Sequence, residues 1–309
     1  MQSISSLPTG SRETIAELTK SFERHLRAEN KRPRTVQTYL ESLAAFDRFL
    51  GEQGLPTEAG SIRREDVEAF MGDLLQRAKP STASVRYRAL QQFWRWALSD
   101  DLIVASPMAK MRPPKVVVDP PTVLTEDELR RLLKVCDGSD FRDRRDSALI
   151  WFFLDTGCRL DEVTRLNVTD LDLDNSTVVV LGKGGRKRMV GLGRKSVRAM
   201  DRYLRIRHRQ PKGQTEVGLW LGSKGRMTHS GIAQVLEARG LEAKLARGLH
   251  PHLFRHTWAH MMKTVNAADE EIMALAGWQS HQMLSRYAAS TATARALATH
   301  QRVGPGDRL

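Results

Sequence analysis

The sequence contains few cysteines and no long apolar segment. Cys136 and Cys158 are its only cysteines, too few for a disulfide framework or a four-cysteine zinc site. No apolar run approaches the roughly 20 residues that a bilayer-spanning helix needs. The first residues, MQSISSLPTGSRETIAEL, lack the basic start and apolar core of a secretory signal. We therefore expect a soluble, cytoplasmic protein with no membrane partner.

Negative charge is also under-represented. The 309 residues include 49 Lys and Arg against 36 Asp and Glu, a formal net charge of +13. Such an excess favours polyanionic partners, because each neutralised phosphate releases counterions. The alternative is a basic surface that only keeps the protein soluble. The charge favours nucleic acid as a partner and an association with the nucleoid.

Apolar residues recur every three or four positions in the first third of the chain, which is typical of amphipathic helices. The first apolar face consists of Ile15, Leu18, Phe22 and Leu26. Further helices are expected over residues 35–51, 64–77 and 81–98. Thr35 is a plausible start signal for the first of these, and Gly51 a plausible stop. We predict a loose tail over 1–11 and a domain of about four helices over 12–110.

Four prolines lie in the stretch 111–124, which has no helical period and predicts an extended linker. The second domain, 125–309, begins with a helix whose capping box is Thr125 and Glu128. A largely apolar helix then ends at Gly157, and a short one follows over 159–166. Further helices are expected over 196–209, 230–246, 251–264, 269–275 and 280–289.

Only one segment has a clear strand pattern. Residues 177–181 and 188–192 are β-rich and flank a turn with the sequence GKGG, which predicts a β-hairpin. The hairpin is the single β element expected in an otherwise helical chain. The fold class is therefore mainly α with a small β-hairpin or sheet (α+β), in a two-domain architecture.

Four short segments carry residues suited to phosphodiester cleavage without a metal. They are TGCRLDEV with Arg159, LGKGGRK with Lys183, HPHLFRHTWA with His252 and Arg255, and GWQSHQMLSRYAAS with Tyr287. Arginine grips phosphate oxygens with two parallel hydrogen bonds. Tyrosine can form a covalent intermediate, and lysine and histidine can move protons. All the residue types for such chemistry thus lie in one predicted domain.

Each of these residues also has an ordinary structural interpretation. Arg159 suits an ion pair with a neighbouring carboxylate, Asp161 or Glu162. Lys183 suits a solvated turn, and the GKGG segment lacks the spacing of a nucleotide-binding P-loop. His252 and Arg255 suit a polar helix surface, and Tyr287 a core or interface position. The combination therefore carries the functional interpretation, since no single residue does.

The order of these motifs resembles the active site of the tyrosine recombinases, the phage-type integrase family. That family shows TG-x-R-x-x-E, a GKG hairpin, H-x-x-R-H-[ST], a His or Trp, and then a tyrosine. Here the motifs read TGCRLDE, GKGG, HLFRHT, AGW and RY, and Trp278 lies nine positions before Tyr287. The resemblance covers nearly the whole chain, because RPRTVQTYLESLAAFDRFL is similar to the family's N-terminal DNA-clamping domain.

The resemblance implies how the scissile phosphate is held. Arg159 and Arg255 resemble the pair of arginines that clamp it. Glu162 resembles the acidic residue that orients the first arginine. His256 is expected to support the site without acting chemically.

The resemblance also implies the reacting groups. Tyr287 resembles the nucleophile that forms a covalent 3′-phosphotyrosine. Lys183 resembles the acid that protonates the 5′-oxygen, with Lys187 as a second candidate, and His252 resembles the acid–base histidine. Trp278 replaces the more usual histidine, as in some members of the family. Its indole N–H can still donate to phosphate but cannot titrate.

The implied reaction needs no cofactor, ATP or metal, because the phosphotyrosyl ester conserves the bond energy. The implied partners are double-stranded DNA target sites and three further copies of the chain, in a tetramer. A helical start at residue 12 leaves no room for an accessory arm-binding domain, so simple target sites are expected. The segment STATARALATHQ after Tyr287 suits either exchange with a neighbouring protomer or packing within its own domain.

The helix over 81–98 is the best candidate for base contacts. Its polar side chains that could read base edges are Arg86, Arg88, Gln91, Gln92 and Arg95. The alternative for them is a solvated helix face. Two other functions remain open: a type IB topoisomerase, and a DNA-binding protein on the same fold without catalysis.

Overall fold

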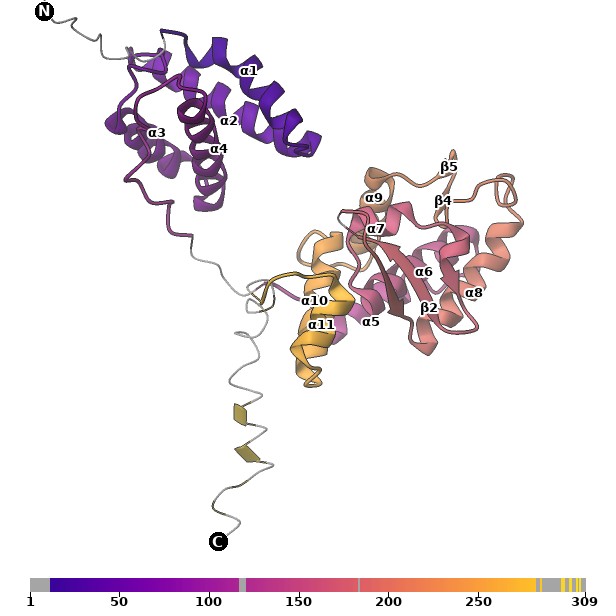
Figure 1. The fold of residues 1–309 in the computed structure, drawn as a ribbon. Helices are drawn as coiled ribbons and strands as arrows, with labels where there is room; N and C mark the ends of the chain where they lie inside the picture. The colour runs from indigo at the N-terminus through magenta and orange to yellow at the C-terminus, as the bar shows by residue number, and fades with distance from the viewer. Residues whose placement is uncertain are drawn as a thin grey trace, which may run out of the picture. The chain divides into compact units, whose positions relative to one another are not determined.

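The computed structural model describes residues 12–116, 121–182 and 184–281, and a few separate positions from 284 onward. The chain forms two compact units, Met1–Val118 and Asp119–Leu309 (Figure 1). In the described part, no helix has the length and apolar character needed to cross a membrane. The predicted fold class, mainly helical with a small sheet, is confirmed.

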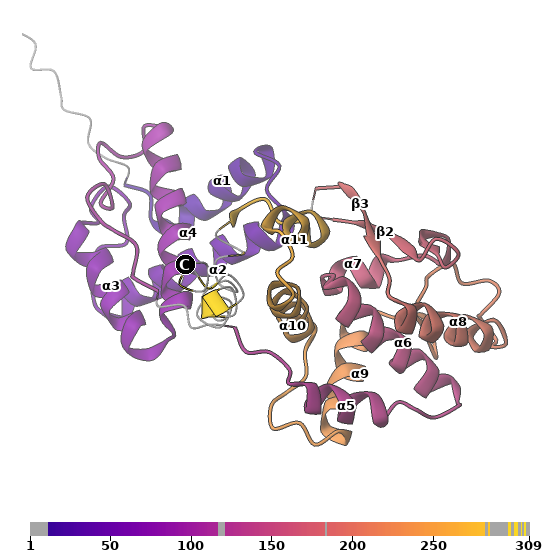
Figure 2. The same ribbon diagram turned by 90° about the horizontal axis from the view of Figure 1, so that it is seen from below.

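Within its described residues, 12–116, the first unit has four helices around an aromatic core. They are α1 (Ile15–Ala28), α2 (Pro33–Glu52), α3 (Arg64–Arg77) and α4 (Pro80–Ser99). The helices α1 and α2 lie side by side (Figure 2). Phe22 meets Phe93 edge to face at 5.3 Å, and Phe46 and Phe70 lie 5.1 Å apart, so large rings join the helices.

The predicted ends of α2 are wrong by a few residues. The helix begins at Pro33, with Arg32 in the N-cap position, and Thr35 lies inside its first turn. Proline suits a first turn because its φ is already helical and its missing N–H has no partner there. Gly51 lies inside the helix, which continues to Glu52.

The second unit is a helical body with a small sheet. Its first elements are α5 (Glu126–Lys134), α6 (Phe141–Thr156), α7 (Leu160–Arg165), the 3-10 turn η1 (Val168–Asp170), β1 (Leu171–Asp172), β2 (Thr177–Leu181) and β3 (Lys187–Gly191). The later ones are α8 (Arg194–His208), β4 (Leu221–Gly222), β5 (Gly225–Arg226), α9 (His229–Glu242), α10 (Pro251–Thr264) and α11 (Asp269–Ala276).

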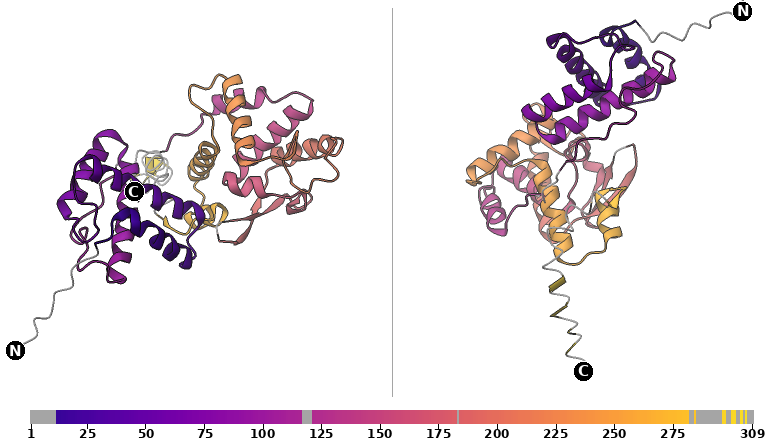
Figure 3. Two further views of the ribbon diagram at one scale, coloured as in Figure 1. Left: turned by 90° about the horizontal axis from the view of Figure 1, so that it is seen from above. Right: turned by 90° about the vertical axis from the view of Figure 1, so that its left-hand side faces the viewer.

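The apolar helix α6 is central to the second unit. Its residues Leu149, Phe152 and Phe153 are fully buried. α8 packs alongside it, as Figure 2 and the left-hand view of Figure 3 show. β1, β2 and β3 form an antiparallel sheet in that order, with Val178 opposite Val190 on its buried face.

Several predicted boundaries in this unit need correction. Strand β3 begins and ends one residue earlier than predicted, at Lys187 and Gly191, and no sequence pattern indicated β1 or the pair β4–β5. Helix α9 ends at Glu242, because Lys244 adopts a positive φ of 51° and the chain turns back there. The predicted helix over 280–289 lies almost wholly outside the described residues.

Candidate active site

Arg159 is placed by the end of α6. Gly157 ends that helix with a φ of +55°, and a Cβ there would meet the ring of Trp258 at 2.5 Å. Only glycine fits such a position without strain. The chain then turns so that Arg159 caps α7. Its backbone N–H donates to Glu162 Oε2 at 2.8 Å, and its Nη1 donates to Oε1 at 3.1 Å.

Glu162 is shared between two arginines. Its side chain is only 3% exposed, and Arg188 from β3 donates to both of its oxygens at 2.9 and 2.8 Å. Burial opposes ionisation of this carboxyl group. The hydrogen bonds from Arg188 and from the Arg159 backbone outweigh burial, so the pKa of Glu162 lies below its ordinary value. Glu162 is therefore a fixed negative charge between Arg159 and Arg188.

Arg188 was missed by the sequence reasoning. Besides Glu162, it contacts the Leu275 carbonyl through Nε at 2.7 Å and Cys158 Sγ through Nη2 at 3.7 Å. The alternation of side chains along β3 could have pointed to it, since Arg188 shares the inward-facing side of the strand with Val190. A charged residue at an inward position needs a buried partner.

Arg255 lies buried near the start of α10. It is 4% exposed, and it donates to the carbonyl oxygens of Gly157 at 2.7 Å and Ala276 at 2.8 Å. Burial, and then the nearby charge of Arg159, lower the pKa of Arg255 to about 10. The group remains protonated at neutral pH. Its two backbone partners tie the end of α6 to the end of α11.

His252 lies one turn before Arg255 on the same helix. Partial burial lowers its pKa below the ordinary value of 6.5, and the charges of His250, Arg255 and Arg159 lower it further. The charge of Arg159 thus acts on both Arg255 and His252, so these three predicted residues lie in one electrostatic environment. His256 follows one turn later, with its ring 6.5 Å from that of His252. His252 is accordingly neutral at pH 7.

Trp278 packs directly on the predicted phosphate clamp. Helix α11 ends at Gly277 with a φ of +63°, and the chain turns there into Trp278. The Arg255 guanidinium lies 4.9 Å from the Trp278 ring centroid, a cation–π contact. The indole is 7% exposed, so its position is set by packing.

Two predicted residues, Lys183 and Tyr287, lie outside the described residues. The turn that contains Lys183 is nevertheless anchored on both sides. Gly182 donates to the Arg186 carbonyl at 2.8 Å, and a Cβ on Gly182 would lie 3.3 Å from Arg188 Nη1. The base of the hairpin turn is therefore next to the Glu162–Arg188 pair. Lys187 is exposed at the start of β3.

The candidate base-reading residues occupy α4. Arg88, Gln91, Gln92 and Arg95 follow the spacing of one helix face, with Arg88 and Arg95 exposed. Arg86 is half-buried and donates to the Glu41 carbonyl at 3.2 Å, so it faces α2. Among the described residues, no three His, Cys, Asp or Glu side chains gather as a metal site.

Comparison with known proteins identifies the family. Residues 122–294, more than half of the chain, match the model of the phage integrase family. Residues 18–103 match the phage integrase N-terminal SAM-like domain. The chain belongs to the phage integrase family.

A curated relative and two solved structures illustrate this membership. The tyrosine recombinase XerD of Bifidobacterium longum is 30% identical over 302 residues, covering 92% of this chain and 97% of the relative. The Tn1549 transposon integrase, solved with transposon right end DNA, is 18% identical with a TM-score of 0.75, covering 94% and 100% of the two chains. A lambda integrase tetramer on a Holliday junction is 17% identical with a TM-score of 0.70, covering 87% and 78%.

Proposed function

We propose that this protein is a site-specific DNA recombinase that cuts and rejoins strands through a 3′-phosphotyrosine on Tyr287. The observation that carries the proposal is the set of basic groups around Glu162. The charge of Arg159 lowers the pKa of Arg255, and the charges of both arginines lower the pKa of His252. Family membership and the XerD relative support the same activity.

In this proposal, Arg159 and Arg255 hold the scissile phosphate. The Arg159 side chain is 31% exposed, so part of its guanidinium is open to a phosphate oxygen while Glu162 holds the rest. Arg255 is fixed by two carbonyl groups, so little reorganisation is needed when charge develops on the phosphate. Trp278, stacked on Arg255, would help to position the phosphate through its N–H.

Proton transfer would involve His252 and the hairpin lysine. A neutral imidazole can accept the proton of the Tyr287 hydroxyl, and the lowered pKa of His252 keeps it neutral near pH 7. The bond between phosphorus and the 5′-oxygen then breaks as the tyrosyl ester forms. We assign the proton for that oxygen to Lys183, with Lys187 as the second candidate. Attack by a 5′-hydroxyl on the ester reverses these steps and needs no external energy.

The proposed substrate is double-stranded DNA carrying specific target sites, with a tetramer as the active assembly. The support comes from relatives: the Tn1549 integrase was solved with transposon end DNA, and lambda integrase as a tetramer on a Holliday junction. Arg88, Gln91, Gln92 and Arg95 are proposed to face the DNA from α4.

The experiment that tests this function is covalent trapping. The full chain is incubated with a library of nicked suicide duplexes, and adducts that survive denaturant are digested and analysed by mass spectrometry. We expect nucleotides on the peptide that contains Tyr287. Tyr287→Phe should abolish the adduct, whereas Tyr39→Phe, which removes the same hydroxyl from the first unit, should not. An equal adduct from Tyr287→Phe would refute the mechanism.

A second measurement separates recombination from topoisomerase activity. Captured duplexes are offered in pairs, and joint products are scored together with relaxation of a supercoiled plasmid that lacks the captured sequence. Exchange between paired duplexes is the expected result. Relaxation of any plasmid without exchange would favour a type IB topoisomerase instead.

A further inference from the structure

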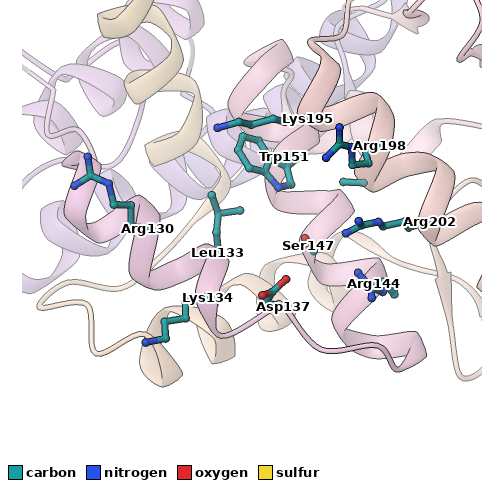
Figure 4. Close-up of a pocket in the computed structure, with 11 residues that line it drawn as sticks. Arg130, Leu133, Lys134, Asp137, Arg144, Ser147, Trp151, Lys195, Arg198 and Arg202 are labelled. Carbon is teal, nitrogen blue, oxygen red and sulfur yellow. The ribbon is translucent and has the colours of Figure 1, made fainter.

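A second cationic surface lies on the second unit, apart from the arginines around Glu162. It is a cavity of about 460 Å³ between α5, α6 and α8 (Figure 4). Six of its lining residues are basic, namely Arg130, Lys134, Arg144, Lys195, Arg198 and Arg202. Among the described residues, Asp137 is the one acidic residue that lines it. The floor includes Trp151, and Lys195 Nζ lies over its ring, 5.5 Å from the ring centroid.

This cavity is separate from the proposed cleavage site. Trp151 and Arg144 precede Gly157, the end of α6, by 6 and 13 residues. At a rise of about 1.5 Å per residue, they lie roughly 9 and 20 Å back along the helix axis. A phosphate held by Arg159 and Arg255 therefore cannot also occupy the cavity.

Most of the charges in the cavity are not neutralised by the protein itself: among the described residues Arg130 pairs with Glu126 at 2.7 Å, and the other five basic lining residues form no ion pair. Elsewhere on its surface, arginines pair with a carboxylate four residues away, as Arg165 does with Asp161 and Arg205 with Asp201. Within the described part of the chain, Arg144, Arg198 and Arg202 form no ion pair. The positions four residues before and after Arg198 carry Arg194 and Arg202. Like charges at this spacing destabilise a helix, so the arrangement favours a bound anion.

The form of the cavity favours an extended polyanion over a small one. Its basic side chains on α5 and α8 are exposed and stand around an open, partly apolar floor (Figure 4). Lys195, Arg198 and Arg202 lie on α8, and Arg202 follows Lys195 by seven residues, about 10 Å along the helix axis. Successive phosphates on one DNA strand advance about 3.4 Å along the duplex, so this row matches roughly three phosphates.

We propose that the cavity between α5, α6 and α8 is a second DNA-backbone site, which binds a segment other than the one at the cleavage site. The contacts would be to phosphate, so they would not depend on base sequence. The site goes beyond the proposed catalytic function, because binding there requires no chemistry at Tyr287. Binding in this cavity would let the protein contact DNA that flanks or crosses the cleaved site.

The first test compares two double variants of matched charge. Arg198→Gln/Arg202→Gln removes two arginines from the cavity. Arg142→Gln/Arg209→Gln removes two exposed arginines outside it. Binding of a random-sequence duplex to the full chain is measured by fluorescence anisotropy between 50 and 200 mM salt. Loss of two phosphate contacts should lower the slope of log K against log salt by about 1.8, and the control should keep the wild-type slope.

The second test locates the DNA directly. Lys134 and Lys195 line the cavity, whereas Lys244 does not. Acetylation of each lysine is followed by mass spectrometry with and without saturating duplex, with inorganic tripolyphosphate, and with polyglutamate. Protection of Lys134 and Lys195 by duplex, with Lys244 unchanged, is the expected result. Protection by tripolyphosphate or polyglutamate but not by duplex overturns the proposal, as does equal slope loss in both double variants.

Discussion

Arg188→Gln should strongly destabilise the second unit. The substitution removes both hydrogen bonds that Arg188 donates to Glu162, at 2.9 and 2.8 Å, and the bond to the Leu275 carbonyl. Glutamine cannot restore the charge. A carboxylate that is 3% exposed is then left with Arg159 as its one charged partner.

The magnitude follows from the cost of an uncompensated buried charge. Removing one partner of a buried ion pair typically costs 3–5 kcal/mol, far more than the pair itself contributes over an apolar replacement. Because Arg159 still contacts Glu162, the lower end of that range applies. We expect a loss of about 3 kcal/mol, roughly a hundredfold change in the folding equilibrium. The loss of stability caused by Arg188→Lys should be smaller than that caused by Arg188→Gln but greater than zero, since lysine keeps the charge but not the planar fork.

The assay must report on the second unit alone. Urea denaturation of the full chain is followed by hydrogen exchange and mass spectrometry on peptides from α6, which belongs only to that unit. Arg186→Gln is the matched control, because Arg186 is exposed two residues away on the same hairpin. Its effect should stay within about 0.5 kcal/mol. If the two variants unfold at the same urea concentration, the buried-charge reasoning is refuted.

The same pair makes a pH prediction. The pKa of Glu162 in the folded protein lies below its ordinary value of 4.5. Such a group contributes stability that is complete above pH 4.5 and is lost as the pH falls through the folded-state pKa. The stability difference between wild type and Arg188→Gln should therefore be constant near neutrality and shrink below pH 4.5. A difference that grows on acidification would contradict the assignment.

Four shorter predictions concern the site around Arg255. Arg255→Gln should slow single-turnover cleavage of a suicide duplex by about a hundredfold or more, and an unchanged rate would remove Arg255 from the phosphate clamp. Trp278→His should retain more cleavage activity than Trp278→Ala, because imidazole keeps a donor and a ring against the guanidinium; equal losses would argue against both roles. The kcat/KM of cleavage should be level above pH 6.5 and fall below it as His252 gains a proton, and His252→Gln should lose that dependence. Gly157→Ala should destabilise the second unit by more than about 1 kcal/mol in urea, since φ is +55° and the new Cβ would meet Trp258; a neutral effect would show that the turn can relax.

The sequence was most informative where local signals agree. Pro251–Thr264 was predicted with its exact bounds, because proline at the first turn and a regular apolar period point to the same helix. The predicted end of α6 at Gly157 is likewise confirmed, since a positive φ favours glycine. Capping of α5 by Thr125 and Glu128 is present as expected. Each of these features depends on a few neighbouring residues.

Features that depend on distant partners were not predictable in the same way. β4 and β5 have two residues each, too few for an alternating pattern, and they form because the surrounding chain brings them together. The end of α9 was placed too late, since Leu245 continues the apolar period although the backbone has already turned at Lys244. Among the site residues, motif order led to Arg159, Glu162 and Arg255. Arg188 lies outside the four motif segments, and its role depends on Glu162, which lies against it only in the folded chain.

The way each arginine is held explains how the cluster can keep positive charge for a phosphate. Arg188 and Arg159 share one carboxylate, Glu162, whereas Arg255 is held by two backbone carbonyls, and no described carboxylate pairs with it. Carbonyl groups at helix ends stabilise a cation through partial charges without cancelling its net charge. Three arginines and one glutamate leave a net charge of +2 in the cluster. A second carboxylate would stabilise the unliganded fold more, but it would weaken the attraction for the negative charge that develops on the phosphate during attack. Backbone acceptors thus allow Arg255 to stay buried and still keep its positive charge for the phosphate. A buried ion pair with a carboxylate would cancel that charge.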